Sequence, residues 1–306
     1  MILPAAFPPP WAGGWGEDRK GVFAEVVVRG VTMEMRWIPP GRFLMGSPED
    51  EPGRSKDEGP QHGVTLSRGF WLAATPCTQA QWEAVMGSTP SLFKGPDRPV
   101  ESVSWEDCRA YCAALNKLLP GLEARLPTEA EWEYACRAGT TSAFNDGSAC
   151  TAPEGDVPAL NRLDWYDRDS GGETHMVGQK AANAWWLYDM HGNVWEWCQD
   201  LYGSYASESQ IDPTGAESGD FRVVRGGGWF FHARICRSAY RFWSHPGFRG
   251  DDLGFRLAAG QLPEKNERSE GRGAEEADAP GPRDEASAPR PERHALREKS
   301  RKAARK

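Results

Sequence analysis

Arg225-Gly-Gly-Gly-Trp-Phe-Phe-His-Ala-Arg-Ile-Cys-Arg-Ser-Ala-Tyr-Arg241, closed by Gly254-Phe-Arg-Leu257, is the most informative stretch of this 306-residue chain. It contains one cysteine, Cys236, and has Phe231 at the place where a second cysteine could complete a two-sulfur metal site. Soft thiolates bind soft metal ions, and a two-sulfur site needs both of them. The function of the chain therefore depends on what this stretch does with a single cysteine and several aromatic side chains.

The composition indicates a compact, aromatic-rich protein with much irregular structure. Hydrophobic residues make up 39% of the chain and charged residues 26%, which is enough apolar material for a core. Of the 14 tryptophans, all but Trp11 and Trp15 lie between residues 37 and 243. The 34 glycines and 24 prolines indicate many turns and argue against a helical bundle.

Composition also divides the chain into three parts. Residues 1–22 are rich in Pro and Gly and are expected to be loose, whereas residues 23–260 are expected to form one domain. Residues 261–306 have no aromatic residue, so they cannot bury enough apolar surface to offset the entropy of ordering and are predicted to be a disordered charged tail. Its basic end, 297–306, favours a solvated segment, with a tether to an anionic surface as the alternative.

Charge and cysteine usage limit the partners and the compartment. The net charge is −8, and an acidic protein lacks the positive field that specific nucleic-acid binding needs. The seven cysteines are odd in number and include no Cys-x-x-Cys pair, so neither a disulfide framework nor a zinc ribbon is expected. The N-terminus does not resemble a signal peptide, and no run approaches the roughly 18 apolar residues of a membrane span. We therefore expect a cytoplasmic protein without a membrane span.

Local patterns predict short strands, three helices and long loops. Thr78, Ser104 and Thr128 can each cap the first turn of a helix, and these helices are predicted at 79–86, 105–115 and 129–136. Strands are expected at 26–28, 32–38, 42–45, 64–66, 69–72, 222–230 and 253–258. The segment 138–182 lacks periodicity, which is typical of a functional or ion-stabilised loop. Together these features predict an α+β fold with high loop content.

Six phrases are far more specific in combination than any one of them alone. They are Trp37-Ile-Pro-Pro-Gly-Arg-Phe-Leu-Met-Gly-Ser47, Pro99-Val-Glu-Ser-Val-Ser-Trp105, Arg125-Leu-Pro-Thr-Glu-Ala-Glu-Trp-Glu-Tyr-Ala135, Asp189-Met-His-Gly-Asn-Val-Trp-Glu-Trp197, Arg225-Gly-Gly-Gly-Trp229 and Gly254-Phe-Arg-Leu257. Their order and spacing resemble the formylglycine-generating enzyme (sulfatase-modifying factor) family over roughly residues 24–259. The resemblance implies a C-type-lectin-like fold of short strands, two main helices and ordered loops.

The phrase that runs from 189 to 197 has the chemistry of a calcium loop. Its two carboxylates and the carbonyls of its turn are oxygen ligands, which Ca²⁺ prefers. The family resemblance implies ligands from the Asp189 and Glu196 side chains and from the Gly192 and Val194 carbonyls. The alternative is a turn whose acids are solvated or paired.

The resemblance also implies a copper site, but the sequence departs from it. The family's oxidase uses two cysteines to bind Cu⁺, which activates O₂ to convert a peptidyl cysteine into formylglycine. Its motif is similar to Gly-Gly-Ser-x-x-Cys-x-x-x-x-Cys, and the matching positions are Gly226, Gly227, Gly228, Phe231 and Cys236. Because one thiolate is missing, a two-coordinate site is not expected, and neither is an enzyme. Cys236 would be the catalytic residue if the chain were an oxidase. The possible substitute ligands are His232 and His245.

A second branch of the same fold matches these departures better. Variable proteins of diversity-generating retroelements use this scaffold for binding, and an adenine-directed process rewrites a C-terminal segment similar to Arg-Gly-Gly-Ser-Trp-Asn-Asn-Asn-Ala-Arg-Asn-Cys-Arg-Ser-Ala-Tyr-Arg…Gly-Phe-Arg-Leu. The chain keeps Ala233, Arg234, 236–241 and 254–257 of that pattern, and we call these, with the Arg225 that begins the phrase, the fixed positions. It differs at asparagine positions of that pattern. Residues 229–252 also contain no Lys, Gln, Glu or Met, which rewritten asparagine codons cannot encode. Such codons cannot encode Trp either, so Trp243 would need a different parent codon.

The resemblance places a ligand-binding surface at residues 229–252. Its candidate contact residues, which we call the replaceable positions, are Phe230, Phe231, His232, Ile235, Phe242, Trp243, Ser244, His245, Phe248, Arg249, Asp251 and Asp252. Aromatic and arginine side chains dominate the binding energy of protein interfaces, although aromatics can also belong to a core. We expect a non-catalytic, calcium-stabilised lectin-like protein with a protein ligand. The alternative is a copper-dependent formylglycine-generating or related metal-dependent oxidase.

Overall fold

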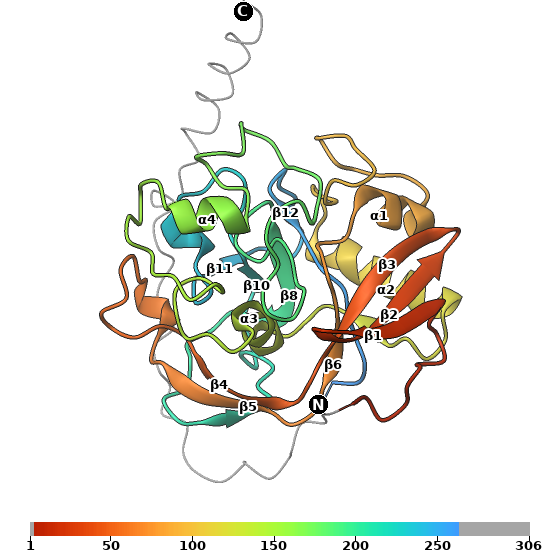
Figure 1. The fold of residues 1–306 in the computed structure, drawn as a ribbon, viewed down its shortest axis with the longest axis horizontal. Helices are drawn as coiled ribbons and strands as arrows, with labels where there is room; N and C mark the ends of the chain where they lie inside the picture. The colour runs from red at the N-terminus through yellow and green to blue at the C-terminus, as the bar shows by residue number, and fades with distance from the viewer. Residues whose placement is uncertain (1–2, 263–306) are drawn as a thin grey trace, which may run out of the picture. The chain divides into compact units, whose positions relative to one another are not determined.

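The computed structural model describes residues 3–262, which form an α+β fold with much ordered loop (Figure 1). This confirms the predicted fold class. The predicted disordered tail lies, from residue 263 onward, outside the described residues. Within residues 3–262, no helix combines the length and the apolar character that crossing a membrane requires.

The first sheet joins the two ends of the domain. Its strands are β1 (Gly14–Asp18), β2 (Gly21–Val28), β3 (Val31–Ile38), β6 (Phe70–Ala73), β7 (Ala124–Arg125) and β13 (Ala258–Ala259). Their order is β1-β2-β3-β6-β13-β7, and every pair is antiparallel. Because β13 lies between β6 and β7, the C-terminal end of the domain is hydrogen-bonded into a sheet that the N-terminal strands begin.

The second sheet carries the C-terminal motif. Its strands are β8 (Trp195–Leu201), β10 (Arg222–Arg225), β11 (Arg241–Ser244) and β12 (Leu253–Gly254). Their order is β11-β10-β8-β12, and β8 pairs with β12 in parallel. Figure 1 shows α3 beside this sheet. A third sheet is made of β4 (Gly41–Met45), β5 (His62–Leu66) and β9 (Gln210–Ile211).

The three predicted helices begin where the sequence places them. They are α1 (Gln79–Met86), α2 (Trp105–Leu118) and α3 (Glu129–Arg137). Thr78, Ser104 and Thr128 each accept a hydrogen bond from the backbone N–H three residues on, which satisfies a free donor of the first turn. The shorter helical segments are η1 (Lys56–Glu58), α4 (Pro158–Leu163) and η2 (Ala233–Cys236).

The strands around the C-terminal motif need correction. The strand expected at 222–230 ends at Arg225, because Gly226 and Gly227 have φ angles of 98° and 74° and turn the chain away. The strand expected at 253–258 is two short strands, β12 and β13. Strand β11, which lies between β10 and β12 in the chain, was not predicted and pairs with β10.

The N-terminal segment also differs from the expectation of a loose region at 1–22. Strand β1 pairs with β2 from Gly14 to Asp18, and Trp11 is buried with its ring 5.7 Å from that of Trp71. Aromatic contacts therefore fix a segment whose Pro and Gly content favours loops. Burial of tryptophan outweighs that local preference.

Candidate ligand-binding surface

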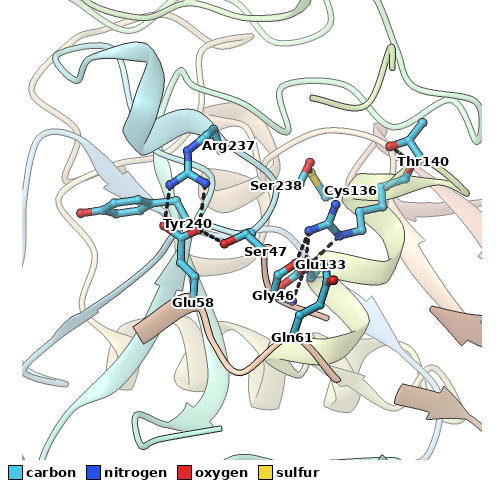
Figure 2. Close-up of polar contacts among 12 residues, drawn as sticks. Gly46, Ser47, Glu58, Gln61, Glu133, Cys136, Thr140, Arg237, Ser238 and Tyr240 are labelled. Atoms are coloured by element: carbon cyan, nitrogen blue, oxygen red, sulfur yellow. Dashed lines mark hydrogen bonds and ion pairs between the residues drawn. The ribbon is translucent and has the colours of Figure 1, made fainter. Parts of the chain in front are cut away.

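The fixed position Arg237 is held by residues from the first quarter of the chain. Its guanidinium is fully buried, and its Nη1 lies 2.8 Å from Oε2 of Glu58 (Figure 2). Ser47 donates a hydrogen bond from its hydroxyl to the same carboxylate oxygen at 2.7 Å. Glu51 and the Gly53 carbonyl accept further hydrogen bonds from Arg237. A buried guanidinium with this many partners fixes the backbone around it.

Two further fixed arginines bind glutamates of α3. Arg241 donates from Nε and Nη2 to the two carboxylate oxygens of Glu129, at 2.8 and 2.6 Å. Arg225 donates to Glu133 and to three backbone carbonyls of residues 238–240. Burial alone would raise the pKa of Glu133, but the charges of Arg137 and Arg225 outweigh it and lower that pKa. The C-terminal motif is thus fastened to α3 as well as to the 47–58 loop.

Close packing holds Cys236 beneath the surface. The Cys236 side chain is fully buried, and burial raises the pKa of its thiol well above its usual value. Gly227 faces it so closely that a Cβ on Gly227 would lie 2.7 Å from the Cys236 sulfur. Ala233, Ser238 and Ala239 are likewise buried. Cys236 therefore acts as a packing residue in this turn.

Four of the five replaceable aromatics, all except Phe248, belong to a continuous row of eight rings, which we call the aromatic row. In order of contact its members are Phe93, Trp229, Phe230, Phe231, Trp195, Phe242, Trp243 and Phe221. Successive ring centroids lie between 4.2 and 6.1 Å apart. All of these spacings except the closest one, between Trp243 and Phe221, are within the roughly 4.5–7 Å range that aromatic pairs prefer. The row runs across the second sheet from the loop before α2 to the residue that precedes β10.

Burial varies along the aromatic row. Trp195 and Trp229 are 5% and 8% exposed and form its floor, whereas Phe242 and Phe221 are 36% and 37% exposed. Phe230, Phe231 and Trp243 are half-buried. The row is therefore part core and part surface, and its outer edges can contact a ligand.

The other replaceable positions are placed around the row with different exposures. His232 is exposed and its Nδ1 lies 2.7 Å from Asp167 Oδ2, while Ile235 packs half-buried against the core. Arg249 forms a two-point ion pair with Asp107, at 2.8 and 2.9 Å. Asp252 is 3% exposed and lies beneath the surface. The remaining members, which are exposed or half-buried, are Ser244, His245, Phe248 and Asp251.

Three members of the row lie outside the segment that sequence reasoning selected. Trp195 belongs to the phrase whose carboxylates suggested calcium, Phe93 precedes α2, and Phe221 precedes β10. Trp195 could have been found, because a large ring beside a motif loop is a candidate for its floor. No local signal marks Phe93 or Phe221, since ring contacts between distant segments leave no trace in spacing.

The residues present do not fit a two-coordinate copper site. Phe231 places a ring against Trp195 where the family's oxidase has a cysteine, and the Cys236 thiol is enclosed. His232 faces Asp167, and His245 lies in an exposed turn. Among residues 3–262, no group of three or more His, Cys, Asp or Glu side chains is arranged to hold a metal ion.

The calcium ligands implied by the family fit only in part. Glu196 is fully buried, and its two carboxylate oxygens accept hydrogen bonds from Arg256 at 2.6 and 2.7 Å and from Trp132 at 2.7 Å. Asp189 accepts a hydrogen bond from the Gly178 N–H on Oδ2, whereas its buried Oδ1 accepts none of good geometry among the described residues, although the nearby Asn193 side chain lowers the Asp189 pKa. Burial raises the pKa of Asp189 to about 6. One side-chain ligand is available, and the other is committed to an arginine.

Comparisons with known proteins agree with this architecture. A family model described as the sulfatase-modifying factor enzyme 1-like domain matches residues 22–260. A formylglycine-generating enzyme from Bos taurus is 35% identical over 203 residues, which are 63% of this chain and 52% of that enzyme. The chain thus spans about half the length of this curated relative.

Two solved structures resemble the whole domain. Treponema denticola variable protein 1 has a TM-score of 0.68 and 30% identity, over 79% of this chain and 99% of that one. PvdO from Pseudomonas aeruginosa has a TM-score of 0.64 and 28% identity, over 81% of this chain and 98% of that one. These similarities confirm the predicted C-type-lectin-like fold, and the match to residues 22–260 shows that the chain belongs to the sulfatase-modifying factor enzyme 1-like family.

Proposed function

We propose that this is a non-catalytic binding protein that contacts a protein ligand through the aromatic row and the replaceable positions around it. The observation that carries this proposal is the division of burial within the motif. The fixed arginines Arg225, Arg237, Arg241 and Arg256 are buried, as is Cys236, and only Arg234 among the fixed arginines is half-buried. Most replaceable positions, in contrast, are exposed or half-buried. A surface built this way can change its side chains without changing the packing that supports it.

The similarity to Treponema denticola variable protein 1 supports the same proposal, because that match covers nearly all of the variable protein. Half-buried aromatics in contact with one another lose little side-chain entropy on binding, which suits them to an interface. We infer that the segment 229–252 is rewritten by a diversity-generating retroelement.

Sequencing the DNA around the gene tests the retroelement. We expect a reverse-transcriptase gene and a near-copy of the DNA for residues 225–257 that differs from it mainly at adenines. Variants from related isolates should differ at the replaceable positions and agree at the fixed ones. Differences spread evenly over both classes, with no near-copy nearby, would sink the proposal.

An oxidase is the second candidate, because the bovine relative is a formylglycine-generating enzyme. The enclosed Cys236 thiol and the Phe231 ring oppose it. Purified protein can be titrated with Cu⁺ against a chelator of known affinity, and a cysteine-containing peptide can be assayed for oxidation. We expect neither tight copper binding nor turnover of the peptide. Cys236→Ala should therefore change neither the Cu⁺ affinity nor the rate of peptide oxidation. Copper binding with turnover that Cys236→Ala abolishes would establish the oxidase instead.

We further propose that a calcium ion binds at the 189–197 loop through Asp189 and backbone carbonyls. The Oδ1 of Asp189 supports this, since a buried carboxylate oxygen without a donor of good geometry favours a cation. The midpoint of thermal unfolding should rise on adding CaCl₂ after EDTA treatment, and Asp189→Asn should remove that rise. An unchanged midpoint in the unaltered protein would contradict the site. A reducing compartment such as the cytoplasm is proposed as well, supported by seven cysteines that are all free and buried.

A further inference from the structure

Two arginines stack on one tryptophan where the aromatic row ends. The guanidinium carbon of Arg222 lies 3.8 Å from the ring centroid of Trp105, and that of Arg109 lies 5.1 Å from it. Trp105 is the first residue of α2, and Arg109 follows one turn later on the same helix face. Arg222 is the first residue of β10.

Strand pairing places this cluster beside the row. Arg222 lies opposite Ser244 and Val224 lies opposite Phe242 in the β10–β11 pair. Residues two apart on a strand point to the same face, so Arg222 and Phe242 share one face of the sheet. The backbone N–H of Trp105 donates a hydrogen bond to the Pro246 carbonyl at 2.9 Å. This bond fixes the start of α2 against the segment after β11.

These two arginines differ from the others that surround the row. Arg168, Arg234 and Arg249 each have a carboxylate oxygen within 4.0 Å, on Asp167, Glu154 and Asp107 respectively. Within residues 3–262, no such ion pair is formed by Arg109 or Arg222.

Arg109 is exposed and Arg222 is half-buried, with one hydrogen bond from its Nη1 to the Gln199 carbonyl at 2.8 Å. Partial burial lowers the pKa of Arg222, and the neighbouring charge of Arg109 lowers it further, which together outweigh the opposite effects of Asp200 and Glu106. Two like charges held together on one ring gain most from an anion that contacts both.

We propose that Arg109 and Arg222 form a carboxylate-binding subsite for an acidic side chain of the protein ligand, next to the apolar contacts of the aromatic row. This inference rests on the proposed binding function and adds the chemistry of its ligand. The ligand segment then carries Asp or Glu beside aromatic or aliphatic residues. Guanidinium groups bind carboxylates through two parallel hydrogen bonds, and the indole beneath holds them in place.

Selection from a random peptide library displayed on phage tests the subsite without a known ligand. Peptides selected on the unaltered full-length protein should be enriched in aromatic residues and in Asp and Glu. Peptides selected on Arg109→Gln/Arg222→Gln protein should keep the aromatic enrichment and lose the acidic one. Aromatic enrichment without acidic enrichment on the unaltered protein overturns the subsite and leaves the binding function standing. No enrichment of either kind overturns both.

A direct measurement of affinity completes the test. Fluorescence anisotropy reports the binding of one selected acidic peptide and of its counterpart in which Gln replaces the acidic residue. Each single variant should weaken the acidic peptide about tenfold and leave the neutral one unchanged. Arg109→Gln alters an exposed side chain, so it keeps the test valid if Arg222→Gln disturbs folding. Arg42→Gln, at an exposed arginine of β4, is the matched control and should change neither affinity. Equal losses for both peptides, or none for either, would refute the subsite.

Discussion

Arg256 Nε and Nη2 bind the two carboxylate oxygens of Glu196 at 2.6 and 2.7 Å, and both side chains are almost completely buried. A guanidinium thus binds the carboxylate that the family resemblance assigns as a calcium ligand. The same Arg256 donates to the Ala73, Tyr188 and Asp189 carbonyls, so it joins three segments of the chain.

Removing one partner of this pair should therefore be costly. Arg256→Met and Glu196→Gln should each lower the free energy of unfolding by about 3–5 kcal/mol, because each leaves a buried charge without its partner. Urea denaturation measures this loss. The double variant should lose less than the sum of the two. Additive losses would show that the two side chains stabilise the fold independently.

The division between fixed and replaceable positions predicts two different responses to substitution. Arg237→Met should lower the free energy of unfolding by about 3 kcal/mol or more, because Glu58 would stay buried without its cation. Phe248→Ser should change it by less than about 1 kcal/mol, because that ring is 37% exposed. Thermal or urea unfolding of both variants provides the comparison. Similar losses at the two positions would contradict the division.

Gly227 should tolerate no side chain. Gly227→Ala combines a φ of 74° with a Cβ placed 2.7 Å from the Cys236 sulfur, so strain and overpacking act together. We expect a loss of about 2–4 kcal/mol in unfolding free energy. Gly171→Ala is the matched control, because Gly171 has a φ of 65° and nothing within 4 Å of an added Cβ. Gly171→Ala should lower the unfolding free energy by only about 1 kcal/mol. Equal losses for the two variants would show that the close contact with Cys236 does not contribute.

His191 should make the protein less stable in mild acid. Burial lowers the pKa of His191 to about 4 from its ordinary 6.5, so between these values the unfolded chain binds the proton more readily than the folded one. The stability contributed by the neutral ring is present above pH 6.5 and is lost as pH falls towards 4. Between pH 7 and pH 5 this amounts to about 2 kcal/mol.

His191→Gln isolates this effect from those of other groups. The measurement is the change in unfolding free energy between pH 7 and pH 5 in the unaltered protein and in the variant. The variant should show a smaller loss on acidification. Identical pH dependence in the two proteins would mean that His191 titrates alike in the folded and unfolded chains.

The sequence predicts features that depend on a few neighbouring residues. The helix starts at Thr78, Ser104 and Thr128 were found because a capping box needs only four consecutive residues. Strand β11 was missed, because Arg241 to Ser244 carries an aromatic run that resembled part of a ligand loop. What pairs it with β10 is the turn that Gly226 and Gly227 begin, and a turn's direction depends on φ angles that spacing does not reveal.

The candidate surface divides in the same way. The motif identified Phe230, Phe231, Phe242 and Trp243, since they lie in one segment. Trp195 joins the row between Phe231 and Phe242 only through tertiary packing. Glu196 is an example of a residue whose partner the sequence alone does not reveal. Its carboxylate oxygens suit calcium, but the structure shows that they bind Arg256.

The fastening of Arg225, Arg237 and Arg241 to glutamates far earlier in the chain has a counterpart at the level of codons. A mutagenic process that acts on adenines cannot change the residue that a CGN codon encodes, because the adenine of CGA is in the synonymous third position, but it can change the residue encoded by AGA or AGG. If the segment is rewritten in this way, the buried arginines should be encoded by CGN, so that the gene can be edited repeatedly beside them without unfolding its product. The ion pairs that stabilise the turn would then determine the codons for which selection favours CGN over AGA or AGG.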